Sequence, residues 1–501
     1  MNASRTSVLL LAALGCAADP KPAPAPGPLG SSTVAPTPHA PPTGSAVAAD
    51  SAGSAAVDDP WAAKPKAPDT PETRKARAEA ALARVATIKP KIASLRELAF
   101  KHEVATAYQT ADDFRTYVKA ELAKDLPPAQ AATVSAALTH IGLIPKPVDL
   151  ALTLEQTLAT QVGAYYEPRL DKFFVVMVPD SEMMLDVMSS HELVHGLQHH
   201  HFALDKLMPP GMYNNDAVSE DTATAIRFLV EGDATYSMLV YAIADTLKTT
   251  KLDAKAAQLL RTQVDTLAAM DVAALKGSMS QQGAAFSTMD ADLKASFDAI
   301  DSLPAAIIVP MVGSYTKGAL VAAVAFEHGG WPALNALYAN PPQSTEQVLH
   351  PSTKLFPKRE MPVTVTFPAS KDALVTDVMG ELNWWIYFDQ WAKDKAATAA
   401  EGWGGDRFSV TKRPDGKLVA SIATTWDTPA DAKQFAEAYT ASLAARFPAG
   451  GTDVKKGIAR PDGGKVFVQQ KGSHVFIVDG ADDVKALATL AKTTKFQKRT
   501  K

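Results

Sequence analysis

Residues 190–198 read Ser-His-Glu-Leu-Val-His-Gly-Leu-Gln, with two histidines four positions apart and a glutamate directly after the first. We predict that this stretch lies in a helix from about residue 181 to residue 200. Residues four apart lie one turn apart on the same helix face, so His191 and His195 can present both imidazoles to one metal ion. Glu192 then points beside them toward a metal-bound water. The spacing predicts a zinc site with Glu192 as the catalytic base.

The same string has a plainer explanation, a surface helix with stacked histidines. An HExxH string arises by chance in roughly one chain in a hundred of this length and composition. The following run, residues 199–201, consists of three more histidines and can bind metal adventitiously. A third ligand is what separates a metal site from a coincidence.

The third ligand is expected on a second helix. Residues 222–239 are mostly apolar and read as a long helix that contains Glu231. A buried carboxylate in such a helix is costly unless it is paired or metal-bound, so Glu231 is the preferred ligand. The alternative is an exposed helix residue. Asp233 or Glu220 is expected to orient the metal-bound histidines from behind.

Aromatic candidates flank this predicted site. Residues 164–178 are aromatic and β-branched around a Pro-Arg-Leu-Asp turn, which predicts a hairpin directly before the motif helix. Tyr165 and Tyr166 lie on its first strand and are expected to line the cleft. A peptidase also needs a group that stabilises the oxyanion, and Tyr315 and His350 are the candidates. For each of these four residues the alternative is a structural role.

A helix with HExxH followed by a second helix with Glu-Gly-x-Ala resembles the gluzincins, the thermolysin and aminopeptidase branch of zinc peptidases. A closer likeness is to a group of bacterial envelope proteins placed with peptidase MA-like gluzincins. The blocks that carry it are residues 163–168, 191–198, 230–234, 341–351, 402–407 and 426–428.

This resemblance implies a zincin-like core with Glu231 as the third zinc ligand. It also implies that substrate lies extended against an edge strand above the motif helix, which would be residues 173–178. Part of the branch has Asp four positions after the ligand Glu. Thr235 stands there in this chain, which puts that orienting role in doubt.

The N-terminus reads as an export signal. Arg5 precedes the apolar run 8–14, and Gly15-Cys16 follows at once, so residues 1–16 resemble a lipoprotein signal with lipidated Cys16. The alternative is an ordinary secretory signal with an incidental cysteine. Residues 17–73 are rich in Pro and Ala and are expected to form a disordered tether. Because Cys16 is the only cysteine, disulfides, Cys-ligated zinc and Cys nucleophiles are excluded from the folded part.

The composition predicts an α+β protein that is mainly helical. We expect an N-terminal helical region over residues 74–162, a gluzincin-like metallopeptidase domain over 163–395 and a small C-terminal α+β domain over 396–501. The aromatic run 382–391 is expected at the domain junction rather than in a carbohydrate site. With a net charge of −4 and no basic stripe, nucleic acid is not an expected partner.

Together these features predict an exported zinc-dependent peptidase that binds one Zn²⁺ per chain and cleaves peptides or proteins. It would be lipid-anchored in a bacterial cell envelope, at the outer membrane or the periplasmic face. The alternatives are a catalytically idle zinc-binding scaffold and a binding lipoprotein whose HExxH is fortuitous. The intact Glu192 argues against an idle site. The sequence leaves open the oligomeric state and whether the N-terminal helices act as a pro-segment.

Overall fold

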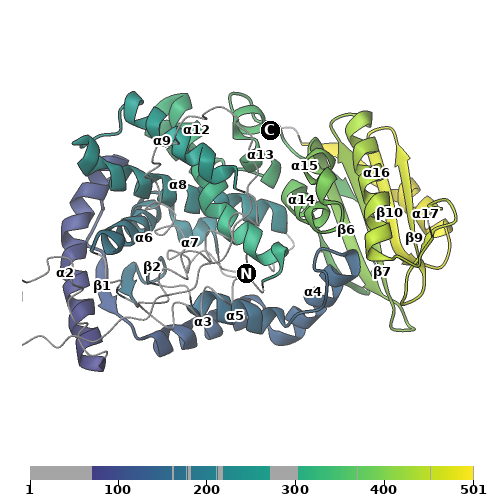
Figure 1. Ribbon diagram of the computed structural model, residues 1–501, viewed down its shortest axis with the longest axis horizontal. Helices are drawn as coiled ribbons and strands as arrows, with labels where there is room; N and C mark the ends of the chain where they lie inside the picture. The colour runs from purple at the N-terminus through teal and green to yellow at the C-terminus, as the bar shows by residue number, and fades with distance from the viewer. Residues whose placement is uncertain are drawn as a thin grey trace, which may run out of the picture.

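The computed structural model describes residues 70–160, 163–176, 178, 182–209, 212, 218–270, 303–368, 370–451 and 453–499. These residues form an α+β structure that is mainly helical, as the sequence predicts. The expected signal sequence with Cys16 and the tether up to residue 69 lie outside the described residues. Residues 70–73, predicted as the end of the tether, instead form the cap and first turn of helix α2 (Pro71–Arg96), because a capping box and a proline at the first helical position start the helix there. Figure 1 shows a helical body on one side and a layer of strands and helices from the C-terminal part on the other.

The helical body contains two groups of elements. Its helices are α2 (Pro71–Arg96), α3 (Ala111–Asp125), α4 (Pro128–Ile141), α5 (Leu150–Thr160), α6 (Glu182–Phe202), α7 (Leu204–Leu207), α8 (Glu220–Leu247), α9 (Ala254–Ala268), α12 (Ala305–Ala339) and α13 (Thr345–Leu349). Its strands are β1 (Ala105–Tyr108), β2 (Ala164–Glu167) and β3 (Lys172–Val175). The motif helix α6 packs against α2 and α8, and α8 packs against α12.

Helix α2 begins at a capping box, in which Thr70 and Thr73 bond to each other's backbone N–H groups, and Pro71 takes the first helical position. The sequence suggests a break near Pro90, but the helix continues through it. A proline inside a helix removes one backbone hydrogen bond. The apolar row that includes Ile88 and Ile92 is buried on either side of Pro90, and this packing offsets the loss.

The small sheet of the body has the strand order β1-β3-β2. β2 and β3 form the predicted antiparallel hairpin, and β1 pairs with β3 in parallel. The strand expected at the edge, residues 173–178, is therefore central, which corrects that prediction. The reason is that residues 105–108, far upstream, add a strand beside it. The edge strand next to the motif helix is β2, which packs on α6.

Helix α12 is the most apolar long helix of the body. By length and composition it is apolar enough to cross a membrane, yet 78% of its most apolar window is buried inside the protein. Its contacts with α8 and α9 account for this burial. Within the described ranges no other helix passes this test. The helix kinks at Gly329 and Gly330, where the backbone leaves helical geometry.

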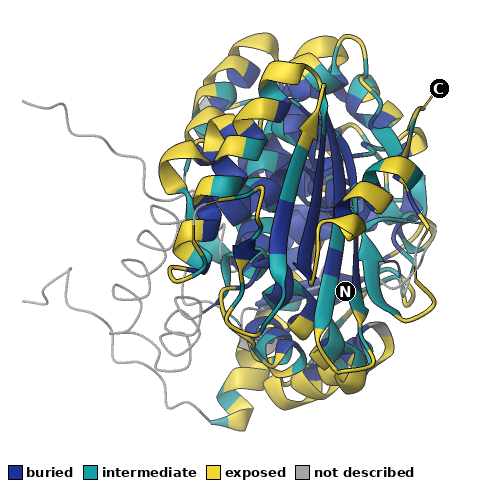
Figure 2. Cartoon of the chain, turned by 90° about the vertical axis from the view of Figure 1, so that its right-hand side faces the viewer, coloured by how far each residue is buried: buried dark blue, intermediate teal, exposed yellow. Residues whose placement is uncertain are grey.

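The C-terminal part is built on an antiparallel sheet with the order β5-β6-β7-β10-β9-β8, and β11 pairs separately with β4. Its strands are β4 (Val363–Thr366), β5 (Ala373–Asp377), β6 (Trp403–Lys412), β7 (Leu418–Trp426), β8 (Ile458–Ala459), β9 (Lys465–Lys471), β10 (His474–Ala481) and β11 (Lys495–Lys498). Its helices are α14 (Gly380–Trp391), α15 (Ala396–Ala400), α16 (Pro429–Arg446) and α17 (Lys485–Thr493). Figure 2 shows this part from outside, with buried central strands and exposed outer faces on the helices.

The sheet begins earlier than residue 396, where the composition changes. Its first strand, β5, covers residues 373–377, and α14 follows it directly. Trp384 and Tyr387 of the aromatic run are buried, and both rings contact Tyr439 of α16. Several faces of α14 are thereby covered at the junction between the helical body and the sheet, as the aromatic run suggests.

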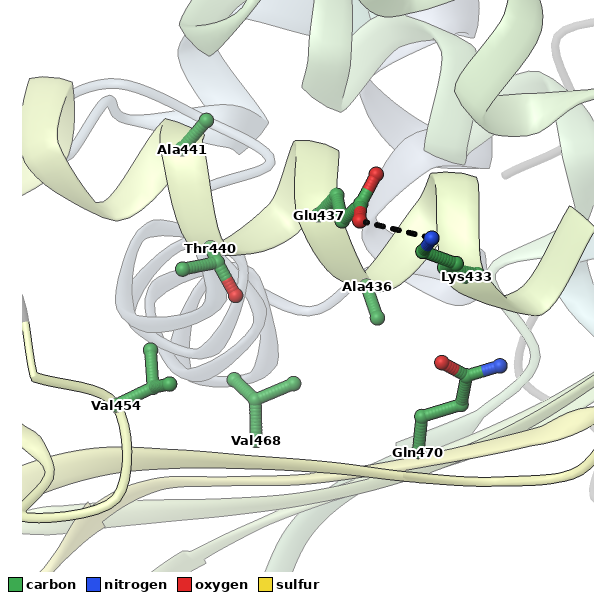
Figure 3. Close-up of a pocket in the computed structure, with 8 residues that line it drawn as sticks. All are labelled: Lys433, Ala436, Glu437, Thr440, Ala441, Val454, Val468 and Gln470. Carbon is green, nitrogen blue, oxygen red and sulfur yellow. Dashed lines mark ion pairs between the residues drawn. The ribbon is translucent and has the colours of Figure 1, made fainter. Parts of the chain in front are cut away.

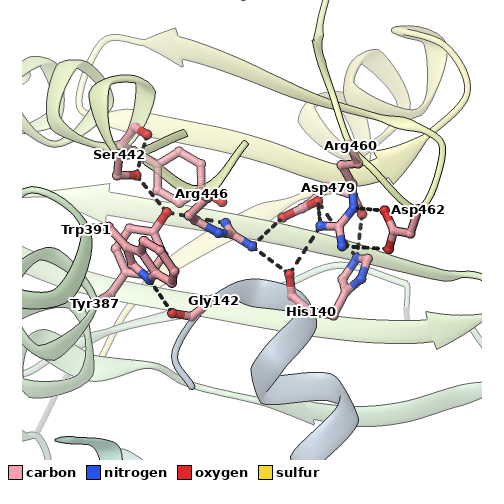
Figure 4. A network of polar contacts seen from close by, with 10 residues as sticks. His140, Gly142, Tyr387, Trp391, Ser442, Arg446, Arg460, Asp462 and Asp479 are labelled. Atoms are coloured by element: carbon pink, nitrogen blue, oxygen red, sulfur yellow. Dashed lines mark hydrogen bonds and ion pairs between the residues drawn. The ribbon is translucent and has the colours of Figure 1, made fainter. Parts of the chain in front are cut away.

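The C-terminal part is hydrogen-bonded to the C-terminal end of α4. The last carbonyls of a helix have no partner inside the helix, and here side chains from α14 and α16 supply donors. Arg446 Nη2 donates to His140 O at 2.7 Å, and Trp391 Nε1 donates to Gly142 O at 2.7 Å (Figure 4). Gly142 adopts a positive φ of 83° as the C-cap, which favours glycine.

A buried charge completes this junction. Asp479 of β10 is fully buried, and its carboxylate is paired with Arg446 and Arg460 (Figure 4). His140 Nε2 lies 3.1 Å from Asp479 O, and burial lowers the pKa of His140. A buried carboxylate persists only with such partners. These ion pairs lie within the C-terminal part and hold the two arginines in place. The hydrogen bonds that Arg446 and Arg460 donate to His140 O then fix the C-terminal sheet against the helical body.

Candidate metal centre

Three side chains from α6 and α8 converge on one point. His191 Nε2 lies 3.2 Å from Glu231 Oε2 and 3.2 Å from His195 Nε2, and His195 Nε2 lies 3.4 Å from Glu231 Oε2. A tetrahedral zinc ion with bonds of about 2.0–2.1 Å separates any two of its ligand atoms by about 3.3–3.4 Å. The three candidate ligand atoms are therefore spaced as the ligands of a zinc ion would be. All three residues are buried.

The tautomer of His195 also fits a metal ligand. Gln198 Nε2 donates to Val230 O at 2.9 Å, which fixes the orientation of its amide. Gln198 Oε1 must then accept from His195 Nδ1, 2.8 Å away. In its neutral form His195 therefore carries its proton on Nδ1 and directs the lone pair of Nε2 toward His191 and Glu231. This is the tautomer that a metal-bound histidine needs.

The charges around Glu231 favour the ionised form of its carboxyl group. Burial opposes ionisation of Glu231, but the adjacent His195 and His191 lower its pKa to about 2. Burial lowers the pKa of His191, which keeps that ring neutral and able to donate a lone pair. Burial opposes protonation of His195, but the charge of Glu231 raises its pKa to about 9. A metal ion would take the place of that proton, and two imidazole nitrogens and one carboxylate oxygen are a donor set of the kind that catalytic zinc sites use.

Glu192 lies beside the ligands and contacts the edge strand. Along an antiparallel pair, the backbone groups of successive residues point alternately toward the partner strand and away from it. The N–H of Tyr166 points away from β3. It donates to Glu192 Oε2 at 2.9 Å. Burial raises the pKa of Glu192 to about 8. A buried carboxylate with a raised pKa can accept and return a proton near neutral pH.

The two tyrosines of β2 lie on opposite faces of the strand, because successive side chains alternate. Tyr165 packs on Phe174 in a separate apolar cluster and donates to Gln109, so it does not line the site as expected. Tyr166 lies over the motif helix, and its hydroxyl donates to Asp171. Two parts of Tyr166 lie near the site. Its backbone N–H contacts Glu192, and its ring covers α6 at Gly196.

The two oxyanion candidates are separated by the fold. Tyr315 of α12 is buried, and its ring centroid lies 5.6 Å from that of His191. It packs against Met238 next to the ligands. His350 follows α13, and its Nε2 lies 2.7 Å from Glu381 Oε1 of α14. The hydrogen bond to Glu381 raises the pKa of His350. The structure thus brings Tyr315 to the centre and places His350 in a different polar cluster.

A second cluster of metal-binding residue types lies near the hairpin turn. Asp171 is 2.9 Å from His102 Nδ1 and 2.9 Å from His200 Nε2. The N–H of Lys101 donates to His200 Nδ1 at 3.2 Å. A neutral His200 must then carry its proton on Nε2 and donate it to Asp171, so that atom has no lone pair for a metal. We interpret this cluster as a hydrogen-bond network that fixes the hairpin turn to α6.

The sequence interpretation missed Gln198. Asp233, predicted to orient the histidines, does not contact them, and Gln198 Nε2 donates to Asp233 Oδ2 at 3.2 Å instead. Glu220, the other candidate, is the first residue of α8, where its N–H donates to Asp377. A signal for Gln198 existed, because it follows His195 by three positions and therefore faces the same side of the helix.

The C-terminal part also has a shallow groove between α16 and β9 (Figure 3). It is lined by Lys433, Ala436, Glu437, Thr440, Ala441, Val454, Val468 and Gln470. Its one ion pair, Lys433 with Glu437, spans 3.7 Å and is exposed. These residues include no group of metal ligands and no nucleophile paired with a base.

Comparison with known proteins reaches only the C-terminal part. Residues 367–491 match a family described as a domain of unknown function, DUF8575. The match begins just before β5 and ends within α17, so it covers the sheet and its helices rather than the three ligands. No curated protein and no solved structure matches the chain.

Proposed function

We propose that this protein is a zinc-dependent peptidase of the gluzincin type. His191, His195 and Glu231 would hold one zinc ion, and Glu192 would serve as the general base. The observation that carries the proposal is the convergence of the three ligand atoms at 3.2–3.4 Å beside a buried carboxylate. Export and a lipid anchor at Cys16 belong to the same proposal and rest on the sequence pattern alone.

Zinc, when bound, supplies a Lewis acid that polarises a carbonyl and lowers the pKa of a water molecule. The chain supplies the proton transfer. Glu192 would take a proton from the attacking water and pass it to the leaving nitrogen, and its raised pKa suits both steps. The hydrogen bond from the Tyr166 N–H keeps its carboxylate oriented beside the ligands. Tyr315, next to His191, is the candidate for stabilising the oxyanion.

The edge strand supports a peptide as the substrate. β2 has one strand neighbour, β3, in the described sheet, and its other edge faces the motif helix. An extended peptide added along this edge would lie beside the proposed ligands and would pair with the backbone groups of β2 other than the Tyr166 N–H, which is bonded to Glu192. Main-chain pairing of this kind tolerates many sequences, so it suits a peptidase with a broad substrate range.

The experiment is a comparison of Glu192→Gln with Glu182→Gln in a zinc-loaded peptidase assay on an unfolded protein. Both residues lie on α6, and Glu182 is exposed. Glu192→Gln should keep zinc and lower turnover by about 10²–10⁴-fold, the contribution of a general base. Glu182→Gln should behave as the parent does. Full activity in zinc-loaded Glu192→Gln would contradict the proposal.

A further inference from the structure

Arg96, the last residue of α2, lies deep in the protein although it belongs to the N-terminal region. Its Nε donates to Asp233 Oδ1 at 2.8 Å and its Nη2 donates to Asp233 Oδ2 at 3.1 Å, so the pair is bidentate. Both side chains are fully buried. Nη2 also donates to Asn335 at 2.6 Å, and the guanidinium lies 4.4 Å from the Trp331 ring. Such a fork holds a carboxylate in one orientation.

Asp233 transmits this orientation toward the metal centre. Tyr338 and Gln198 both donate to its Oδ2, at 2.7 Å and 3.2 Å. The amide of Gln198 is thus held by Asp233 and by Val230 O, which leaves its Oε1 facing His195 Nδ1. An unbroken row of hydrogen bonds therefore runs from α2 through α8 to α6.

We propose that Arg96 is a positioning residue of the metal centre, acting through Asp233 and Gln198 on His195. The inference rests on the zinc centre proposed above. It also assigns a role to α2. Because Arg96 neutralises a buried carboxylate behind the ligands, α2 is a permanent part of the centre and not a pro-segment that is removed on activation.

The rest of α2 is also packed into the helical body, against α6 and α8. Its inner face is a row of buried apolar residues, and the chain continues from α2 into β1, which pairs with the central strand β3. Arg84, about three turns before Arg96, makes a second bidentate ion pair, with Asp186 of α6. That pair is partly exposed and has no hydrogen-bonded path to the ligands among the described contacts. Arg84 is therefore a matched control.

The test measures the zinc dissociation constant of the full chain by competition with a chromophoric chelator. The variants are Arg96→Met, Arg96→Lys and Arg84→Met, with folding checked by circular dichroism. Loss of a residue that orients a metal ligand typically weakens binding by about 10–100-fold, and Arg96→Met should fall in this range. Arg96→Lys keeps the charge but loses the fork, so its constant should lie in between. Arg84→Met should bind zinc as the parent does.

A second variant keeps the test informative if Arg96→Met does not fold. Gln198→Met removes the next member of the row and should also weaken zinc binding at least about 10-fold. The visible spectrum of bound Co²⁺ should change with either substitution, because it reports the geometry of the ligands. Parent-like zinc constants in folded Arg96→Met or Gln198→Met would overturn the inference and leave the zinc proposal standing. Equal losses in Arg96→Met and Arg84→Met would also overturn it. A parent chain that binds no zinc would refute the proposed centre itself.

Discussion

At the scale of single residues, three carboxyl groups lie where the helical body meets the C-terminal sheet: Asp221 and Asp406 are buried, and Asp377 is half-buried. Asp221 accepts hydrogen bonds from the N–H and hydroxyl of Thr345. Asp377 accepts the N–H of Glu220, and Asp406 accepts four donors around α14. Burial, with mutual repulsion, raises the pKa of Asp221 to about 7.

This raised pKa predicts how stability depends on pH. The folded state holds the proton of Asp221 more tightly than the unfolded state, whose pKa is near 3.8. The carboxyl therefore costs nothing below pH 4, and it destabilises the fold progressively as pH rises to 7. Asp221→Asn keeps an oxygen for Thr345 and cannot ionise. Between pH 5 and 7 the free energy of unfolding should fall more steeply in the parent, by up to about 1.4 kcal/mol per pH unit.

Urea unfolding at several pH values measures this difference. Asp112→Asn is the control, because Asp112 is highly exposed on α3. Parallel pH curves for the parent and Asp221→Asn would show that the buried carboxyl does not behave as described.

The residues of the centre were predictable to different degrees. His191, His195 and Glu192 follow from spacing on one helix, and Glu231 follows from the cost of burying a carboxylate, so a single sequence sufficed to bring them together. The places of Tyr165 and His350 in the fold could not be predicted in this way. The face on which Tyr165 lies depends on the register of the hairpin, and the partner of His350 comes from a distant helix.

At the scale of elements, the crossing of α8 and α12 explains why a glycine follows Glu231, the third proposed ligand. A Cβ on Gly232 would lie 2.1 Å from the backbone of Gly318, so the two helices touch through their main chains. This close approach brings Tyr315 of α12 beside His191 of α6. The small residues are thus part of how the centre is assembled.

Gly232→Ala should push α8 and α12 apart. We expect the free energy of unfolding to fall by about 1–3 kcal/mol, as for overpacked cores, together with weaker zinc binding. Gly196→Ala on the motif helix is the comparison, because its new Cβ would meet only aromatic ring atoms, at 3.2 Å or more. Thermal unfolding of both variants measures the predicted loss of stability. If Gly232→Ala is as stable as the parent, the helices are not in main-chain contact.

Elements were predicted well where their signals are local. The hairpin, the motif helix and the ligand helix follow from periodicity and turn residues within short windows. The strand β1 could not be predicted in its place, because its partner β3 lies far along the chain and a short strand has little signal of its own. The same missing partner made β3 look like an edge.

At the scale of the whole molecule, the C-terminal sheet is a docked part of one structure. Arg446 and Trp391 hold the end of α4, and α4 leads through α5 to the edge strand beside Glu192. This arrangement was beyond prediction from one sequence, because its hydrogen bonds join residues more than 300 positions apart. The change of composition near residue 396 falls inside the domain, since β5 and α14 precede it.

The zinc content of the folded chain, measured in the parent and in Glu231→Ala, tests the central claim most directly. Elemental analysis after dialysis against a weak chelator should find one equivalent in the parent. Glu231→Ala removes the only ligand that comes from α8 and should lose most of the metal. Exposed Glu327→Ala on α12 should keep it. Parent protein without zinc after reconstitution, or Glu231→Ala with a full equivalent, would contradict the three-residue centre described here.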